Sequence, residues 1–170
     1  MLKYKWAAYW REMGPALVVA FWRWLQEHHG RVSAALDGTP EVVAVVPSTR
    51  QGLPTPLFRV VAALEDLRPL LHPAVTFRGG YEFSEDRRRA ELTPDAFDAD
   101  DSVLSGRRVL LVEDTWVSGA RALSAAIAVR RASPRSLALV SIARMVYPDA
   151  MTPEYEQAAD RPVDFGRWPR

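Results

Sequence analysis

The sequence contains no cysteine, and this excludes three kinds of site at once. Without thiols the chain cannot form a disulfide, bind zinc through thiolates or use a cysteine nucleophile. Neither sign of charge is in excess, because 22 lysines and arginines stand against 21 aspartates and glutamates, with a net charge of +1. The overall charge therefore gives no reason to expect a nucleic-acid partner or an anionic membrane surface.

Long apolar segments are lacking as well. The most apolar early run, residues 15–25, is interrupted by Arg23 and is far shorter than the roughly 20 residues that a membrane-spanning helix needs. The first residues show no signal-peptide pattern, so we expect a cytoplasmic chain without a membrane partner. Apolar residues make up 48% and charged residues 25% of the 170 residues, which fits one globular domain over residues 1–170.

The N-terminal part of the chain predicts two helices. Apolar side chains, four tryptophans among them, recur at helical spacing from Lys5 to about His29. Gly14-Pro15 falls between two such stretches, and proline is tolerated in the first turn of a helix but not in its interior. We therefore expect a break at Pro15 and a second helix that ends near Gly30, with the tryptophans in the core.

The middle of the chain predicts an α/β fold with a mainly parallel sheet. Continuous apolar runs of β-branched residues are typical of strands that are buried on both faces. A strand, a helix and a further strand joined by short connections form a βαβ unit with a right-handed crossover. We expect strands over residues 41–46, 74–77, 108–112 and 137–142, and helices over 56–66 and 120–132.

Two stretches lack such a pattern. Residues 78–102 contain two glycines, the basic run Arg87-Arg88-Arg89 and several acidic residues. A connection of this length is usually functional or mobile. Residues 147–170 form a weakly patterned C-terminal tail.

The chemistry is concentrated in residues 109–121, at the end of a predicted strand. Ligands of open α/β sheets bind beyond the carboxyl ends of the strands, where Glu113 and Asp114 would lie. The helix N-terminus that follows at Ala120 can hold a phosphate, and two carboxylates can accept hydrogen bonds from a diol or hold a hydrated magnesium ion. Taken singly, the acid pair can also be a helix cap and Ser118-Gly119 an ordinary turn.

This run resembles the phosphoribosyl pyrophosphate motif of type I phosphoribosyltransferases, in which two acids and a Thr/Ser-Gly phosphate loop follow an apolar strand. Within that family the chain is most similar to ComF-type and amidophosphoribosyltransferase-like proteins, although it lacks the cysteine-rich zinc segment of ComF proteins. The resemblance implies a type I phosphoribosyltransferase fold. Such a fold has a mainly parallel twisted sheet flanked by helices, with N-terminal helices and a small hood.

The resemblance also implies roles for individual residues. Glu113 and Asp114 would face the ribose hydroxyls and would hold Mg²⁺ through water or through those hydroxyls. Residues 78–102 would form a mobile flap, in which Arg88 and Arg89 have a catalytic role at the departing diphosphate unless this basic run is simply solvated. The diphosphate would contact Ser48, Thr49 and Arg50, and the 5′-phosphate would lie on Thr115, Trp116, Val117, Ser118, Gly119, Ala120 and Arg121.

Two positions depart from the family pattern. Val117 and Arg121 stand where threonine is usual, so two phosphate-binding hydroxyls are missing. Arg121 can replace them with a charge-assisted contact, or it can point to solvent from the first helical turn.

The function expected from this resemblance is transfer of a phosphoribosyl group. The substrates would be phosphoribosyl pyrophosphate and a nitrogenous base or amine acceptor, with Mg²⁺ as cofactor and pyrophosphate as product. Two alternatives stay open: a non-catalytic regulator that binds phosphoribosyl pyrophosphate, and a ComF-like accessory protein of DNA uptake. A homodimer is compatible with each of them.

Overall fold

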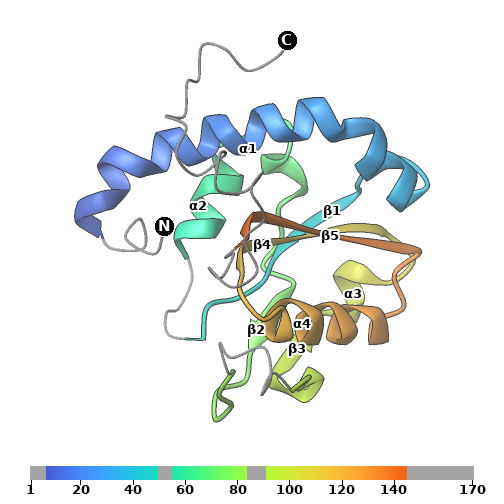
Figure 1. Ribbon diagram of the computed structural model, residues 1–170. Helices are drawn as coiled ribbons and strands as arrows, with labels where there is room; N and C mark the ends of the chain where they lie inside the picture. The colour runs from blue at the N-terminus through green and yellow to red at the C-terminus, as the bar shows by residue number, and fades with distance from the viewer. Residues whose placement is uncertain (1–6, 50–54, 84–90, 145–170) are drawn as a thin grey trace, which may run out of the picture.

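The computed structural model describes residues 7–49, 55–83 and 91–144 (Figure 1). Within these ranges no helix combines the length and the apolar character that crossing a membrane requires. The strands are β1 (Val42–Val45), β2 (Val75–Phe77), β3 (Phe97–Ala99), β4 (Arg108–Trp116) and β5 (Ser136–Arg144). The helices are α1 (Ala7–Leu36), α2 (Pro56–Ala62), α3 (Asp101–Leu104) and α4 (Ala120–Arg131), with the 3₁₀ turns η2 (Arg68–Leu70) and η4 (Pro94–Ala96).

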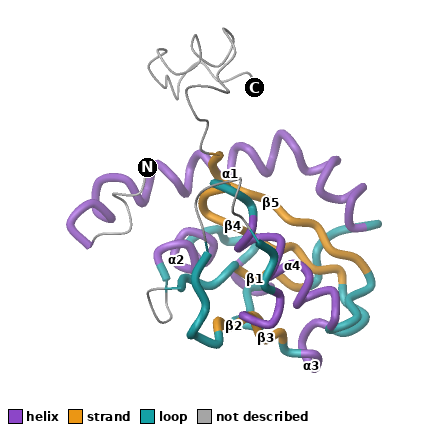
Figure 2. Tube along the Cα trace, turned by 60° about the horizontal axis from the view of Figure 1, so that its bottom comes forward, coloured by secondary structure: helices purple, strands orange, loops and turns teal. Residues whose placement is uncertain are grey.

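The main sheet has three parallel strands in the order β1-β4-β5, with β4 in the centre (Figure 2). Val112 of β4 pairs with Val45 of β1 and with Val140 of β5. The crossover from β4 to β5 is α4, so the predicted βαβ unit is present. These elements confirm the α/β class and the parallel sheet that the apolar runs predicted.

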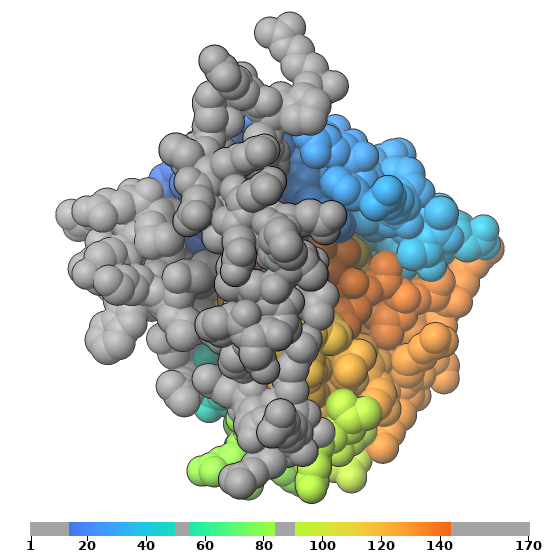
Figure 3. All heavy atoms as spheres, viewed as in Figure 1, coloured from blue at the N-terminus to red at the C-terminus, as the bar shows by residue number. Residues whose placement is uncertain are grey.

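Helices cover both faces of this sheet, and side chains that alternate along β4 enter two different cores. Leu110 and Val112 pack with α1 and α2, whereas Val109 and Leu111 pack with α4 and with the small β2-β3 sheet. In Figure 3 the described surface runs from α1 at the top, through β5 and α4, to the β2-β3 region at the bottom. The central strand β4, which is buried on both faces, therefore fixes the position of the turn and the helix α4 that follow it.

The N-terminal helix is single, so the predicted break at Pro15 and the predicted end near Gly30 are both wrong. Pro15 lies inside this helix and is exposed. Helix α1 continues past Gly30 because Leu36 is fully buried in the core. The left-handed residues that end it, Asp37 at φ 56° and Gly38 at φ 136°, come only after Leu36.

The tryptophans of this helix do not all belong to the core. Trp22 is 46% exposed, so the core interpretation is wrong there. Trp24 is partly buried against the core and stacks on His28, with ring centroids 4.6 Å apart. Trp6 lies outside the described residues.

The three main strands lie where they were predicted, but β4 and β5 are longer than expected. Thr115 and Trp116 pair with Ala143 and Arg144, and this pairing carries β4 four residues beyond Val112. Thr115 and Trp116 are therefore strand residues and not part of a loop. The phosphate loop of the prediction is reduced to a turn of three residues, 117–119.

Residues 78–102 are more ordered than the irregular connection that was predicted. The described part contains η4, β3 and the first residues of α3, and β3 pairs antiparallel with β2 through Thr76 and Asp98. Ala96 and Phe97 are buried, because they fill the space between this small sheet and α4. Residues 84–90, with Arg88 and Arg89, and the tail over 147–170 lie outside the described residues.

One buried hydrogen bond joins this segment to α4. The Thr93 amide donates to the hydroxyl oxygen of Ser124, which is fully buried, at 2.8 Å. We expect Ser124→Ala to lower the free energy of unfolding by about 1–2 kcal/mol, because the Thr93 amide loses its acceptor. Urea unfolding measures this loss. Ser105→Ala, at an exposed serine, is the control and should change stability by less than about 0.5 kcal/mol.

Candidate functional site

The central strand delivers its last residues to a tight turn and then directly to a helix. Gly119 adopts a left-handed conformation at φ 83° and precedes the first residue of α4, Ala120. No side chain of Gly119 can cap this helix, and the Ala120 amide has only a long contact, 3.4 Å, with the Ser118 hydroxyl. The first-turn amides of a 12-residue helix thus point toward the carboxyl end of the sheet, where they can hold an anion.

The acid pair lies at this edge, but it is buried and already bound to a cation. Glu113 is 1% and Asp114 is 7% exposed. The Arg121 guanidinium, from the first turn of α4, donates through Nε and Nη2 to the two Glu113 carboxylate oxygens. Its Nη2 also donates to Asp114 Oδ1 at 2.9 Å. Arg121 therefore does not point into solvent, which was one of the two expected positions.

Burial also changes the proton affinity of the pair. Loss of solvent raises the pKa of Glu113 to about 8; the nearby Arg121 opposes this rise, and Asp114 adds to it. Burial therefore favours the protonated form of Glu113, and the Arg121 guanidinium favours its ionised form. Burial lowers the pKa of Arg121, but the two carboxyl groups outweigh burial and the net shift is upward. Glu113, Asp114 and Arg121 thus form one buried ionic cluster.

This cluster does not fit a directly bound magnesium ion. Mg²⁺ usually keeps several waters and is held by one or two carboxylates together with phosphates of a ligand, whereas here the Arg121 guanidinium already contacts both Glu113 oxygens and Asp114 Oδ1. In the described ranges there is also no group of three or more histidine, aspartate or glutamate side chains that could hold a metal without such a ligand. A metal bound directly to Glu113 would have to displace Arg121.

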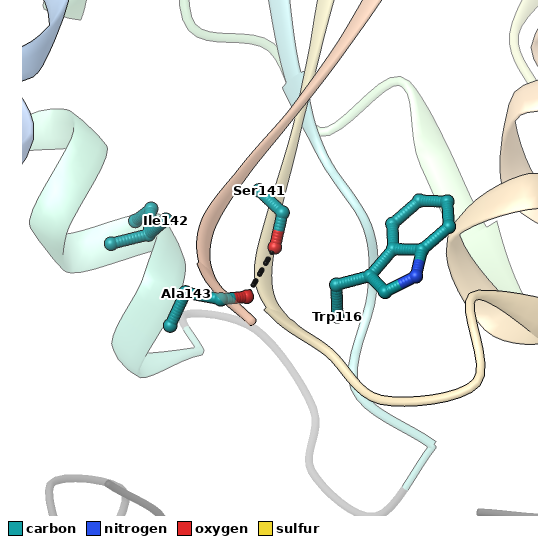
Figure 4. A pocket seen from close by; sticks show the side chains of 4 residues that line it. All are labelled: Trp116, Ser141, Ile142 and Ala143. Atoms are coloured by element: carbon teal, nitrogen blue, oxygen red, sulfur yellow. Dashed lines mark hydrogen bonds between the residues drawn. The ribbon is translucent and has the colours of Figure 1, made fainter. Parts of the chain in front are cut away.

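Thr115 and Trp116 add a polar and an apolar feature beside the cluster. The Thr115 hydroxyl is buried and has no hydrogen-bond partner in the described structure, although buried polar groups are normally paired. The Trp116 ring packs directly on the backbone of Gly119. An open pocket of about 510 Å³ lies between Trp116 and the β5 residues Ser141, Ile142 and Ala143 (Figure 4). The sequence pattern gave no signal for these β5 residues beyond their place in a strand.

The loop after β1 lies at the same edge of the sheet as the acid pair. The Val46 amide donates to the Val112 carbonyl at 2.8 Å, so the chain leaves β1 directly beside Glu113. Ser48 and Thr49 follow within three residues of Val46, in the loop that leaves this edge of the sheet. Arg50, the third residue expected at a diphosphate, lies outside the described residues.

The structure thus brings together most of the residues that the sequence singled out. The acid pair, the turn over 117–119, Ala120 and Arg121 come from one strand-turn-helix unit, and Ser48 and Thr49 come from the loop after the neighbouring strand β1. Arg88 and Arg89 cannot be placed, because they lie outside the described residues. The sequence did not predict the pairing of Arg121 with both acids, which lie seven and eight residues before it in β4.

Comparisons with known proteins add little to this geometry. No family model matches the sequence, and no curated protein matches it. Among solved structures, the chain is similar to one described as the allosteric regulatory enzyme of purine biosynthesis, with a TM-score of 0.46 and 16% identity. The match covers 78% of this chain but only 30% of that one. A likeness at this level carries no argument about chemistry, so the case for a function rests on the residues themselves.

Proposed function

We propose that this chain binds phosphoribosyl pyrophosphate and transfers its phosphoribosyl group to a nitrogenous acceptor, with release of pyrophosphate. The observation that carries the proposal is the strand-turn-helix unit of β4 and α4. It places a polar cluster and a helix N-terminus at the carboxyl edge of a parallel sheet, directly beside the loop after β1. This is the edge where ligands of α/β proteins bind.

Each part of the ligand has a corresponding place in this arrangement. The 5′-phosphate lies on the turn over 117–119 and the first amides of α4, which carry partial positive charge. The diphosphate lies against Ser48 and Thr49, and Asp114 accepts a hydrogen bond from a ribose hydroxyl. The Thr115 hydroxyl, buried without a partner, is a further donor for the sugar. A planar acceptor fits the pocket beside Trp116.

The reaction needs mainly positioning and charge stabilisation from the protein. A lone pair of the acceptor nitrogen forms the new bond to the anomeric carbon. The bond from that carbon to the diphosphate oxygen breaks, and pyrophosphate leaves with the electron pair while the acceptor nitrogen gives up a proton. Donors fixed before the reaction stabilise the charge on the leaving group without reorganisation.

We expect Asp114→Asn to weaken binding of phosphoribosyl pyrophosphate about tenfold, because one charge-assisted hydrogen bond to the sugar becomes a neutral one. Isothermal titration calorimetry with the full chain measures this change. Asp95→Asn is the matched control, since Asp95 lies on the surface in an exposed ion pair with Arg131. Equal affinities of wild type and Asp114→Asn would remove Asp114 from the ligand site.

A second candidate function is binding of phosphoribosyl pyrophosphate without turnover. The ion pairs of Arg121 favour it, because Arg121 already contacts the carboxyl groups that would otherwise act on the sugar. A pyrophosphate-release assay with purine bases, pyrimidine bases and ammonia separates the two candidates. Release above the rate of the acceptor-free control supports the transferase. Tight binding with no release supports the regulator.

A further inference from the structure

The acid pair of this chain carries its own cation. Arg121 contacts both carboxyl groups from the first turn of α4. Glu113 is 1% exposed, and both of its carboxylate oxygens already accept hydrogen bonds from Arg121. A divalent cation placed here would also meet the positive guanidinium at close range, where low solvent access strengthens repulsion. The place that a metal would occupy is therefore filled by the protein.

We propose that Arg121 takes the place of a divalent cation at this site, so that the chain binds the phosphate groups of its sugar phosphate without a metal ion. This inference rests on the proposed function, because it concerns the same ligand site. An arginine is suited to the task because its guanidinium stays protonated at all physiological pH values and matches the geometry of phosphate.

The two edges of the guanidinium have different surroundings. The edge formed by Nε and Nη2 faces Glu113, and Nη2 reaches Asp114 as well. In the described part of the chain, Nη1 has no hydrogen-bond partner, and the Arg121 side chain is 25% exposed. The carboxyl groups thus fix one edge and leave the other available to an anion. Glu113 and Asp114 act as positioning residues for this cation.

The position of Arg121 in the chain supports the same role. It is the second residue of α4, so its charge adds to the partial positive charge of the first-turn amides. The Arg121 charge and the partial charge of these amides both act at the turn over 117–119, where the phosphate would lie. Threonine, the residue expected at this position, can supply a hydroxyl but no charge. The substitution therefore exchanges a neutral phosphate donor for a cation.

The first measurement needs no sugar phosphate. Mn²⁺ is titrated into the full-length wild-type chain and into Asp114→Asn, and bound metal is followed by electron paramagnetic resonance. We expect no Mn²⁺ binding that depends on Asp114. A wild-type chain that binds one Mn²⁺ ion, with loss of this ion in Asp114→Asn, would overturn the proposal.

The second measurement uses ribose 5-phosphate, whose single phosphate chelates divalent ions only weakly. Calorimetric titrations are run in EDTA and in Mg²⁺. The wild type should bind with the same affinity in both buffers within about twofold, and Arg121→Gln should bind at least about tenfold more weakly in EDTA. Binding that requires Mg²⁺, or an Arg121→Gln variant with wild-type affinity in EDTA, would contradict the role of Arg121.

Two further variants keep the test decisive. Arg131→Gln removes an exposed arginine from the other end of α4 and should leave the affinity unchanged. Arg121→Lys keeps the positive charge in case Arg121→Gln does not fold. It should lose about tenfold in affinity, because a lysine cannot contact both carboxyl groups and a phosphate at once; unchanged affinity would count against the proposal.

Failure of the proposed function would look different. If the wild type binds no ribose 5-phosphate in either buffer, the ligand assignment is wrong. The Mn²⁺ titration then still decides the role of Arg121. Absence of Asp114-dependent metal binding supports Arg121 as the cation of the acid pair, and its presence overturns this assignment.

Discussion

Replacing Arg121 with alanine should lower the free energy of unfolding by about 3 kcal/mol, because the substitution leaves the buried acid pair without its counter-charge. Glu113 and Asp114 are almost inaccessible to water, and Arg121 is the cation that contacts both. Urea unfolding at pH 7, monitored by circular dichroism, measures the loss.

A second substitution tests the electrostatic cause of this loss. Adding Asp114→Asn to Arg121→Ala removes the Asp114 charge, and burial raises the pKa of Glu113 without Arg121 to oppose the rise, which favours the neutral form of Glu113 in the double variant. The double variant should therefore recover roughly half of the lost stability. Arg131→Ala, in an exposed pair with Asp95, should cost less than about 0.5 kcal/mol. A double variant less stable than Arg121→Ala would show that lost packing, not charge, causes the effect.

Gly119→Ala should lower the free energy of unfolding by about 2–3 kcal/mol and should weaken phosphate binding at the same time. A left-handed residue with a side chain costs about 1 kcal/mol. The new Cβ atom would also lie 2.7 Å from Cε2 of Trp116 and closer still to Cζ2, so the indole or the turn must move. Thermal unfolding and titration with ribose 5-phosphate measure the two effects.

Two variants separate backbone strain from the steric conflict. Gly106 has a similar φ of 70°, but an added Cβ would meet open space there, so Gly106→Ala should cost only about 1 kcal/mol. Trp116→Val in the Gly119→Ala background removes the ring and should recover the remainder. Equal losses for Gly119→Ala and Gly106→Ala would show that contact between the turn and Trp116 is unimportant.

The sheet was predictable from the sequence because its signals are local. The strand cores of β1 and β4 are uninterrupted apolar runs that are buried on both faces, and the run of β5, at the edge of the sheet, is interrupted only by Ser141. Helix α1 was not predictable in the same way. Its continuity across Pro15 and Gly30 depends on contacts of Leu36 with the core, which are distant in sequence. The order within residues 91–102 likewise depends on packing of Phe97 against α4.

In the candidate site, too, the features with a local sequence signal were predictable and those that depend on distant contacts were not. The position of Glu113 and Asp114 at the sheet edge followed from the end of an apolar run, and the turn followed from Ser118-Gly119. The side-chain partner of the acid pair did not follow. From the sequence, Arg121 was equally compatible with a phosphate contact and with exposure to solvent. Its ion pair with Glu113 and Asp114 arises because α4 begins close to the end of β4, and the sequence does not show this approach.

A crystal structure of the full chain with bound phosphoribosyl pyrophosphate tests the central claim most directly. The account predicts density for the 5′-phosphate within hydrogen-bonding distance, about 3 Å, of the backbone amides at the turn over 117–119 and the start of α4. It also predicts that the outer edge of Arg121 contacts a phosphate oxygen while its inner edge stays on Glu113. Ligand density away from the carboxyl edge of β4, or an empty edge at saturating ligand, would contradict the account.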